Sequence, residues 1–249
     1  MDSTNIPVWE LLQKQMIWNQ LSFIHNKKIL DFGSGRGITA SYFASDNEVV
    51  AIEPDDKMLS ERIVDNDYTQ IHGDMQVLKE FEDESFDVIL CHNVFEYALE
   101  REEIFKEFAR ILKKGGVLSI LKHNRAGRVM QMVVLLNNFE HANELLEGRN
   151  GKAEKFGDIH YYDDMDILKW SNDFEIEKIL GIRTFWDLQQ NQDIQKDEKW
   201  QKQMIAMEQR VCEREEFKAI ASFHHLILRK KPLQYSDFER HFKFEEVLK

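Results

Sequence analysis

The chain has 249 residues, of which 43% are hydrophobic and 31% charged, a balance typical of globular proteins. No run of about 18 apolar residues predicts a membrane span, and the N-terminus lacks the basic-then-apolar order of a secretory signal. We therefore expect one domain over residues 1–249, located in the cytoplasm. Cys91 and Cys212 match no metal or redox spacing, so we expect reduced thiols and no metal site.

The net charge of −12 disfavours loose adhesion to nucleic acid or to anionic membranes, because such adhesion needs a basic face. The charge is unevenly distributed, however. Residues 108–139 contain no acid and carry six positive charges, namely Arg110, Lys113, Lys114, Lys122, Arg125 and Arg128. This window is compatible with a local basic patch on an acidic protein.

In chain order, an N-terminal helix is expected within residues 6–25, with an amphipathic stretch over about Val8–Ile24. Short β-rich runs then alternate with helical stretches. The expected strands are KKILDFG (27–33), EVVAIEP (48–54), YTQIHGD (68–74), SFDVILCHN (85–93) and GGVLSILKH (115–123). This alternation predicts an α/β fold, a doubly wound and mostly parallel sheet with right-handed crossovers.

The alternation breaks after His123. The helical apolar run VMQMVVLLNNF (129–139) and a polar, glycine-bearing stretch predict a helical cap insertion over about residues 124–165, beside the active site. The expected elements after it are a helix at 166–172, a strand at 174–185, a long helix at 194–213 and a final strand at 222–231. The charged tail, 232–249, is expected to be peripheral.

A glycine-rich loop carries the strongest local signal. Asp31, Gly33, Ser34 and Gly35 lie in DFGSGRG, where a buried strand ends and a helix begins. Glycines there let the backbone turn sharply and approach a ligand that a Cβ would exclude. The spacing D-x-G-x-G-x-G is neither that of dinucleotide binders nor that of a P-loop, which favours S-adenosylmethionine over phosphate ligands. A purely structural turn is the alternative.

Acids end the next two strands. Glu53, followed by Pro54, comes within about 20 residues of the glycine loop, where a carboxylate can accept two ribose hydroxyls. Asp74, in IHGDMQ, ends the third strand, where it could face an adenine edge. A solvated surface acid is the alternative for Glu53, and a helix N-cap is the alternative for Asp74.

The fourth strand ends in His92 and Asn93, at the sheet edge where open α/β folds bind ligands. His92 could close over the cofactor, and Asn93 could orient a substrate. For both residues the alternative is a hydrogen-bonded loop cap.

In this order, the motifs DFGSGRG, AIEPDDKM, HGDMQ, FDVILCHNVFEY and ILKKGGVLSI resemble those of class I S-adenosylmethionine-dependent methyltransferases, over residues 28–123. The resemblance implies a Rossmann-like fold, S-adenosyl-L-methionine as cofactor and S-adenosyl-L-homocysteine as product. By the same resemblance, Asp31, Gly33 and Gly35 lie beside the methionine part and Glu53 contacts the ribose. The resemblance also implies that Asp74, Met75 and Gln76 lie near the adenine, with His92 over the cofactor.

The second half resembles the bacterial tRNA wobble carboxymethoxyuridine methyltransferases, through KHNRAGRVMQMVVLLNNFEHA, GIRTFWDL and MIAMEQRVCEREEFKAIASFHHLILRK. These enzymes esterify the carboxylate of a modified uridine in the anticodon loop. Where that family carries an arginine in the first helix that reaches the cofactor, this chain has Gln13 beside Lys14. Either Lys14 substitutes for the arginine, or the carboxylate of the cofactor is held differently.

A carboxylate acceptor is already deprotonated near neutral pH and needs a cationic clamp, not a general base. Arg183 and Arg125 are the candidates for that clamp, and a structural role is the alternative for each. Tyr161, Tyr162 and Trp186 could stack on a base, although aromatic residues more often serve packing. His224 and His225 alternate faces on the last strand and are interpreted as structural.

Three functions remain open at this point. The first is methylation of a modified wobble uridine in the tRNA anticodon loop, and the second is methylation of a small-molecule carboxylate. The third is a non-catalytic cofactor-binding protein or an NAD oxidoreductase. No membrane partner is expected, and the sequence predicts no oligomeric state.

Overall fold

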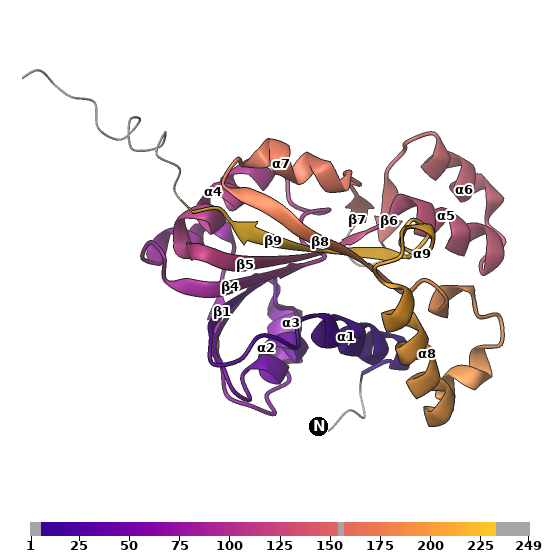
Figure 1. The fold of residues 1–249 in the computed structure, drawn as a ribbon, viewed down its shortest axis with the longest axis horizontal. Coiled ribbons are helices and arrows are strands. Elements are labelled where there is room, and N and C mark those ends of the chain that lie inside the picture. Colours follow the sequence, from indigo (N-terminus) through magenta and orange to yellow (C-terminus); the bar gives the residue numbers. More distant parts are fainter. Residues whose placement is uncertain (1–5, 154–156, 233–249) are drawn as a thin grey trace, which may run out of the picture.

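The computed structural model describes residues 6–153 and 157–232, and the predicted tail at 232–249 lies outside them apart from residue 232. A seven-stranded sheet runs through the centre (Figure 1). Its strands, in spatial order, are β3 (Thr69–His72), β2 (Glu48–Glu53), β1 (Lys28–Phe32), β4 (Phe86–His92), β5 (Leu112–His123), β9 (Phe223–Lys230) and β8 (Phe174–Ile182). All neighbours are parallel except β5–β9 and β9–β8. The predicted doubly wound, mostly parallel sheet is confirmed.

Helices cover both faces of this sheet, as short buried parallel strands require. The helices packed against one face are α1 (Val8–Gln20), α2 (Ile38–Phe43) and α8 (Glu198–Val211); those on or near the other include α4 (Arg101–Ile111), α7 (Ile167–Trp170) and the 3-10 helix η2 (Met75–Glu80). The remaining short helices are α3 (Asp56–Ser60), η3 (Asp164–Asp166), η4 (Trp186–Leu188), η5 (Gln192–Lys196) and α9 (Glu215–Lys218).

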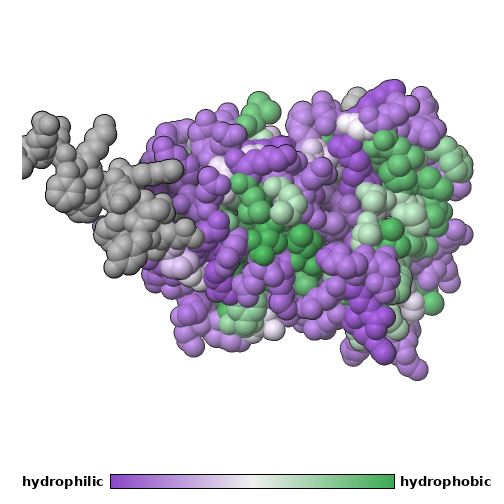
Figure 2. Space-filling view, turned by 45° about the horizontal axis from the view of Figure 1, so that its top comes forward, coloured by the Kyte–Doolittle hydropathy of each residue, from purple (hydrophilic) through white to green (hydrophobic). Residues whose placement is uncertain are grey.

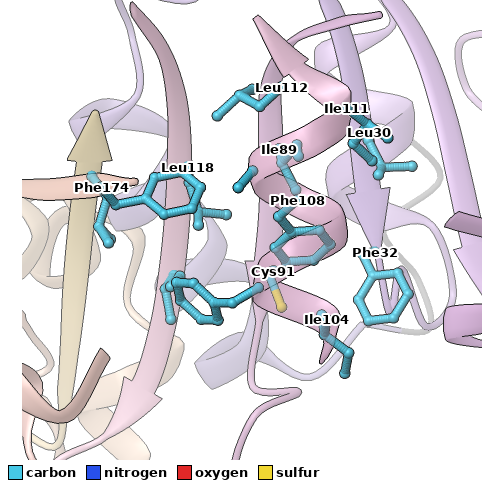
Figure 3. Packing of buried hydrophobic residues seen from close by; sticks show 14 of the residues in the cluster. Leu30, Phe32, Ile89, Cys91, Ile104, Phe108, Ile111, Leu112, Leu118 and Phe174 are labelled. Atoms are coloured by element: carbon cyan, nitrogen blue, oxygen red, sulfur yellow. The ribbon is translucent and has the colours of Figure 1, made fainter. Parts of the chain in front are cut away.

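The α4 face shows why these segments fold as they do. Ile104 and Phe108 recur at helical spacing and pack onto Leu30, Ile89 and neighbouring strand residues (Figure 3). The strands contribute side chains to both faces of the sheet, so their apolar runs are nearly continuous. The core therefore fixes the strand order and with it the edge at which the parallel strands end.

Beyond the end of β5, the described residues within 124–165 include a separate layer, at the right of Figure 1. The elements of this layer are α5 (Arg125–Val134), α6 (Phe139–Leu146) and the hairpin β6 (Gly151–Ala153) with β7 (Gly157–Ile159). Asn124 anchors α5, because its Nδ2 donates to the carbonyls of Ala219 and Ala221 at 2.9 and 2.8 Å. A Cβ on Gly127 would come within 2.0 Å of the Ala221 carbonyl, so this contact requires glycine. We propose that this layer is the predicted cap.

Some boundaries differ from the prediction. β5 begins at Leu112, not at Gly115. The pairing of β5 with β4 shifts register between Leu112 and Val117, and Gly115, with a positive φ of 69°, lies within this irregular stretch. The helix expected from residue 194 begins at Glu198, since η5 forms a separate turn before it. Within the described ranges, no helix is both long and apolar enough to cross a membrane.

Candidate active site

The glycine loop follows β1 and is tied to β2, since the N–H groups of Gly33 and Ser34 both donate to the Ile52 carbonyl. Gly33 and Gly35 have φ of 74° and 57°, a region that favours glycine. A Cβ on Gly33 would lie 2.4 Å from the Val94 side chain, whereas one on Gly35 would meet no atom within 4 Å. The turn at Gly33 is thus set by packing, and the space in front of Gly35 is open.

Glu53, the last residue of β2, is buried and holds the loop from the side. Its Oε2 accepts from the Gly35 N–H at 2.7 Å, and its Oε1 accepts from the Asp55 N–H at 3.0 Å. Each carboxylate oxygen keeps a lone pair after these bonds. A buried carboxylate fixed in this way can still accept a pair of hydroxyl groups.

Asp31 and Lys14 form the charged part of the same edge. Burial raises the pKa of Asp31 to about 6, with Lys14 opposing the shift and Glu53 adding to it. Burial lowers the pKa of Lys14, which Asp31 and Glu10 partly offset, and its Nζ donates to Thr39 Oγ1 at 2.9 Å. Asp31 Oδ2 is buried without a hydrogen-bond partner. The structure therefore brings Lys14 of α1 to the loop beside an acid with a free acceptor atom.

The third predicted segment lies at the same edge but is more exposed. Asp74 is the N-cap of η2, and its Oδ1 accepts from the Gln76 N–H at 2.8 Å. Met75 packs against the core, and the exposed Pro54 offers its carbonyl to His72 at 3.1 Å. The N-cap alternative for Asp74 is confirmed, and its contact with adenine stays a prediction.

His92 and Asn93 follow on β4. His92 is nine-tenths buried, and its Nε2 lies 2.8 Å from Ser119 Oγ while its Nδ1 has no partner. Asn93 has a left-handed φ of 58°, donates its backbone N–H to the Leu121 carbonyl, and keeps a buried, unpartnered Oδ1. Strained backbone and unpaired side-chain atoms at a sheet edge are typical of ligand sites.

These groups fit S-adenosylmethionine by their chemistry. The unpartnered atoms Asp31 Oδ2, Ser34 Oγ, His92 Nδ1 and Asn93 Oδ1 belong to residues at or just after the carboxyl ends of β1 and β4, and the open space at Gly35 also follows β1. An acid and a lysine suit the ammonium and the carboxylate of an amino acid, and Glu53 suits a ribose. When bound, the cofactor would supply an activated methyl group, and the protein would align and desolvate the acceptor.

The predicted clamp arginines lie at the same edge but in different environments. Arg125 opens α5, and its guanidinium lies over the Tyr161 ring, 5.2 Å from the centroid. Arg183 follows β8 and is buried, where it bonds to Asp187 and, at 2.7 Å, to Gln13 Oε1. Because these partners already occupy its two terminal nitrogens, Arg183 is less suited than Arg125 to a substrate carboxylate.

The aromatic residues also divide into two groups. Trp186 is buried against Trp200, with ring centroids 5.0 Å apart. Tyr162 is buried among Trp170, Arg101 and Lys122. This packing corrects the expectation that both could stack on a base, because their faces are covered. Tyr161 remains partly exposed beside Arg125.

One acid at this edge was not singled out by sequence reasoning. Glu96 is fully buried; its Oε1 accepts from the His123 N–H at 2.5 Å and lies 3.1 Å from His123 Nδ1, while its Oε2 has no partner. Burial raises the pKa of Tyr97 to about 12, and Glu96 adds to that shift. The spacing C-H-N-V-F-E carried no signal for this contact, because the partner of Glu96, His123, ends another strand, β5.

The histidines of the last strand lie on opposite faces, as predicted. His224 Nδ1 lies 2.8 Å from Asp164 Oδ2, whereas His225 Nε2 lies 2.7 Å from Ser119 Oγ on the other side. Cys91 and Cys212 are both free and buried. In the described part of the chain, no three acidic, histidine or cysteine side chains are grouped as a metal site would need.

Comparisons with known proteins agree with this geometry. Residues 30–120, which span β1 through most of β5, match the family model described as a methyltransferase domain. A solved S-adenosylmethionine-dependent methyltransferase from Mesorhizobium loti shares the fold, with a TM-score of 0.54 and 15% identity over 88% of this chain and 100% of that one. These findings define the class: the chain is an S-adenosylmethionine-dependent methyltransferase, and S-adenosylmethionine is its methyl donor.

Two curated relatives extend beyond the matched domain. The tRNA 5-carboxymethoxyuridine methyltransferase of Escherichia coli (strain K12) is 22% identical over 235 residues, covering 88% of each chain. The ubiquinone biosynthesis O-methyltransferase of Glaesserella parasuis serovar 5 is 25% identical over 181 residues, covering 66% of this chain and 74% of that one. A methyltransferase is neither a non-catalytic cofactor-binding protein nor an NAD oxidoreductase, so the third open function is excluded. One relative is named as a tRNA methyltransferase and the other as an O-methyltransferase of ubiquinone biosynthesis, so a tRNA acceptor and a small-molecule acceptor both stay open.

Proposed function

We propose that this methyltransferase esterifies the carboxylate of a modified wobble uridine in the tRNA anticodon loop. The observation that carries the proposal is a pair of cap arginines, Arg125 and Arg128, that form no ion pair with any residue the structure describes. Planar guanidinium groups without a carboxylate partner suit a substrate carboxylate or phosphate.

The other cations of the basic window, residues 108–139, differ from this arginine pair because they have acidic partners. Four of its six cations pair with acids: Arg110 with Asp83 and Glu107, Lys113 with Asp87, Lys114 with Glu84, and Lys122 with Asp164. The window is thus mostly neutralised, and its remaining charge is concentrated at the cap. Tyr161 lies near both cap arginines: burial raises its pKa and Glu96 adds to the shift, while the charges of Arg128 and Arg125 oppose it. An aromatic ring near two cations suits an anionic nucleoside.

The similarity to the Escherichia coli tRNA enzyme extends across the cap and supports the same acceptor. The test is methyl transfer from labelled S-adenosylmethionine to tRNA from cells lacking the gene, with an equimolar set of small carboxylic acids in parallel. We expect labelled tRNA whose label is released by mild alkali, as a methyl ester requires. Label in the small acids alone would overturn the proposal.

A second acceptor class is favoured by a separate observation, the unpartnered Oε2 of the buried Glu96. A free carboxylate oxygen could accept the proton of a neutral hydroxyl, and the O-methyltransferase relative acts in ubiquinone biosynthesis. Glu96→Gln separates the two alternatives. It would abolish transfer to a hydroxyl, whereas transfer to an ionised carboxylate would persist.

A further inference from the structure

A chain of four buried or half-buried side chains connects His92, at the cofactor edge, to helix α1. His92 Nε2 lies 2.8 Å from Ser119 Oγ, and the same hydroxyl lies 2.7 Å from His225 Nε2. On the far side of the second ring, His225 Nδ1 lies 2.7 Å from Gln20 Oε1. Gln20 Nε2 then donates to the Gly181 carbonyl at 3.3 Å. The four side chains come from β4, β5, β9 and α1, so only the folded protein brings them together.

Both imidazoles are neutral in this environment. Burial lowers the pKa of His92 well below 6.5, with His225 and Lys14 adding to the shift, and burial lowers the pKa of His225 to about 3. A neutral imidazole has one N–H and one bare nitrogen. A hydroxyl has a single hydrogen to donate, so Ser119 must donate to one ring and accept from the other. The two rings are therefore opposite tautomers.

Gln20, at the far end of this row of side chains, fixes the direction in which the hydrogen bonds are donated. The Gly181 carbonyl can only accept, so the amide nitrogen of Gln20 must face it, because a flipped amide would place two oxygens 3.3 Å apart. Gln20 then offers its oxygen to His225, whose Nδ1 must carry the hydrogen and whose Nε2 is bare. Ser119 donates to that bare nitrogen and accepts from His92 Nε2–H. His92 Nδ1 is left as a bare acceptor, and it is the atom without a partner.

We propose that Ser119, His225 and Gln20 form a positioning relay that holds His92 as its Nε2–H tautomer, so that its Nδ1 accepts a hydrogen bond from an N–H or O–H group of the bound cofactor. Lys14 acts electrostatically on both His92 and Asp31, so this cation lies near the ring and near the acid. An acceptor-only nitrogen excludes a carboxylate from the position beside it. The relay concerns the cofactor and does not depend on the acceptor proposed above.

The direct test is the tautomeric state of both rings in the ligand-free protein, read from ¹⁵N chemical shifts and long-range couplings at pH 7. His92→Asn and His225→Asn assign the two sets of signals. We expect His92 as the Nε2–H form and His225 as the Nδ1–H form. The same tautomer in both rings, the reverse pair, or an imidazolium in either would overturn the proposal.

Ser119→Ala tests the consequence for binding. We expect His92 to lose its fixed tautomer and the affinity for S-adenosylhomocysteine to fall about 3- to 10-fold, the loss expected for one neutral hydrogen bond. The matched control is Ser85→Ala, which removes a serine hydroxyl without a hydrogen-bond partner just before β4, at the opposite edge, and should leave affinity unchanged. If Ser119→Ala fails to fold, Gln20→Leu replaces it, with His225 expected to become a mixture of tautomers.

Binding of 5′-methylthioadenosine identifies the donor group. This ligand lacks the amino-acid part of the cofactor. A Ser119→Ala penalty seen only with S-adenosylhomocysteine would assign His92 Nδ1 to the ammonium, and a penalty with both ligands would assign it to the nucleoside. No penalty with either ligand, in a folded variant, would overturn the relay.

Discussion

The carboxyl edge of the sheet has two ends, and they treat polar groups differently. At the β1–β2 end, backbone N–H groups already fix the key carboxylate, because Glu53 accepts from Gly35 and Asp55. At the β5 end, the cap presents Arg125 and Arg128 without acidic partners among the described residues. At the first end the carboxylate is already fixed in the ligand-free protein, whereas at the second end the two arginines lack a counter-charge that a ligand would supply. This difference suits a cofactor site at the β1–β2 end and an acceptor site at the β5 end.

The surface repeats this contrast. Figure 2 shows hydrophobic surface in two areas separated by hydrophilic residues, one of them toward the cap. Leu136, Phe139 and Leu146 are exposed apolar side chains of this cap. Exposed apolar residues in the same cap as a cationic pair suit a large, partly aromatic substrate more than a small acid.

The largest effect is expected at the cofactor end. Glu53→Ala removes a carboxylate predicted to accept two ribose hydroxyls, and hydrogen bonds to charged groups contribute about 1.5–3 kcal/mol each. Calorimetry should register at least about a 100-fold loss of S-adenosylhomocysteine affinity. Glu48→Ala, at the exposed opposite end of the same strand, is the control and should bind normally. Wild-type affinity in Glu53→Ala would remove the ribose assignment.

The cap arginines should affect the acceptor alone. Arg125→Ala combined with Arg128→Ala is expected to lower kcat/KM for tRNA on the order of 30- to 100-fold, because charge-assisted bonds to the acceptor are lost. Cofactor affinity should stay unchanged. Arg149→Ala is the matched control in the same cap, since Arg149 already pairs with Glu144 and Glu147. Equal losses in cofactor binding would show that the two ends are not separate.

Asp164 anchors the end of segment 124–165, between Lys122 and His224. Burial would raise its pKa, but the His224 hydrogen bond and Lys122 lower it to about 2. A folded-state pKa below the unfolded value of 3.8 stabilises the protein above pH 3.8, and this contribution is lost as the pH falls toward 2. Asp164→Asn should lower the free energy of unfolding at pH 7 by about 2 kcal/mol in urea titrations. Asp158→Asn, exposed on the hairpin, should have no effect; equal stability of both variants would contradict the anchor.

Among the ligand-binding effects, that of Asp31 should be the smallest, with the clearest pH dependence. Its raised pKa, about 6, means that the acid is protonated at pH 5 in the ligand-free protein, where it cannot attract an ammonium. S-adenosylhomocysteine affinity should therefore fall about tenfold between pH 7.5 and pH 5, and the Asp31→Asn variant should lack this dependence. A pH-independent wild type would contradict the assignment.

The same shift predicts a stability trade-off at Asp31. Because the folded-state pKa lies above the unfolded value, the stabilising contribution is present below pH 3.8 and is lost as the pH rises through 6. Asp31→Asn should therefore raise the free energy of unfolding at pH 8, by up to about 3 kcal/mol. The ionised Asp31 carboxylate would then favour ligand binding but lower the free energy of unfolding.

The cofactor end could be predicted from the sequence because its signals are local. The glycine loop, Glu53 and His92 each directly follow or end a buried strand, and parallel strands end at one edge. Five predicted strands therefore placed the candidate residues before any contact was known. Lys14 was the exception, since it became a candidate only through the resemblance, and its position near Asp31 comes from the structure.

The rest depended on contacts between distant residues. Glu208 accepts from the N–H groups of Thr184 and Phe185, and so fixes the loop that buries Arg183. Ser119 joins two histidines from different strands, and Glu96 meets His123 across the sheet edge. No local pattern encodes these contacts, because each partner comes from another element. The same holds for the hairpin inside the cap, whose strands are three residues each.

The acceptor is tested most directly by comparing tRNA nucleosides, by mass spectrometry, from cells with and without the gene. The account predicts that one methyl-ester wobble nucleoside disappears in the cells without the gene and that its free carboxylic acid accumulates. Identical nucleosides in the two cell types would contradict it.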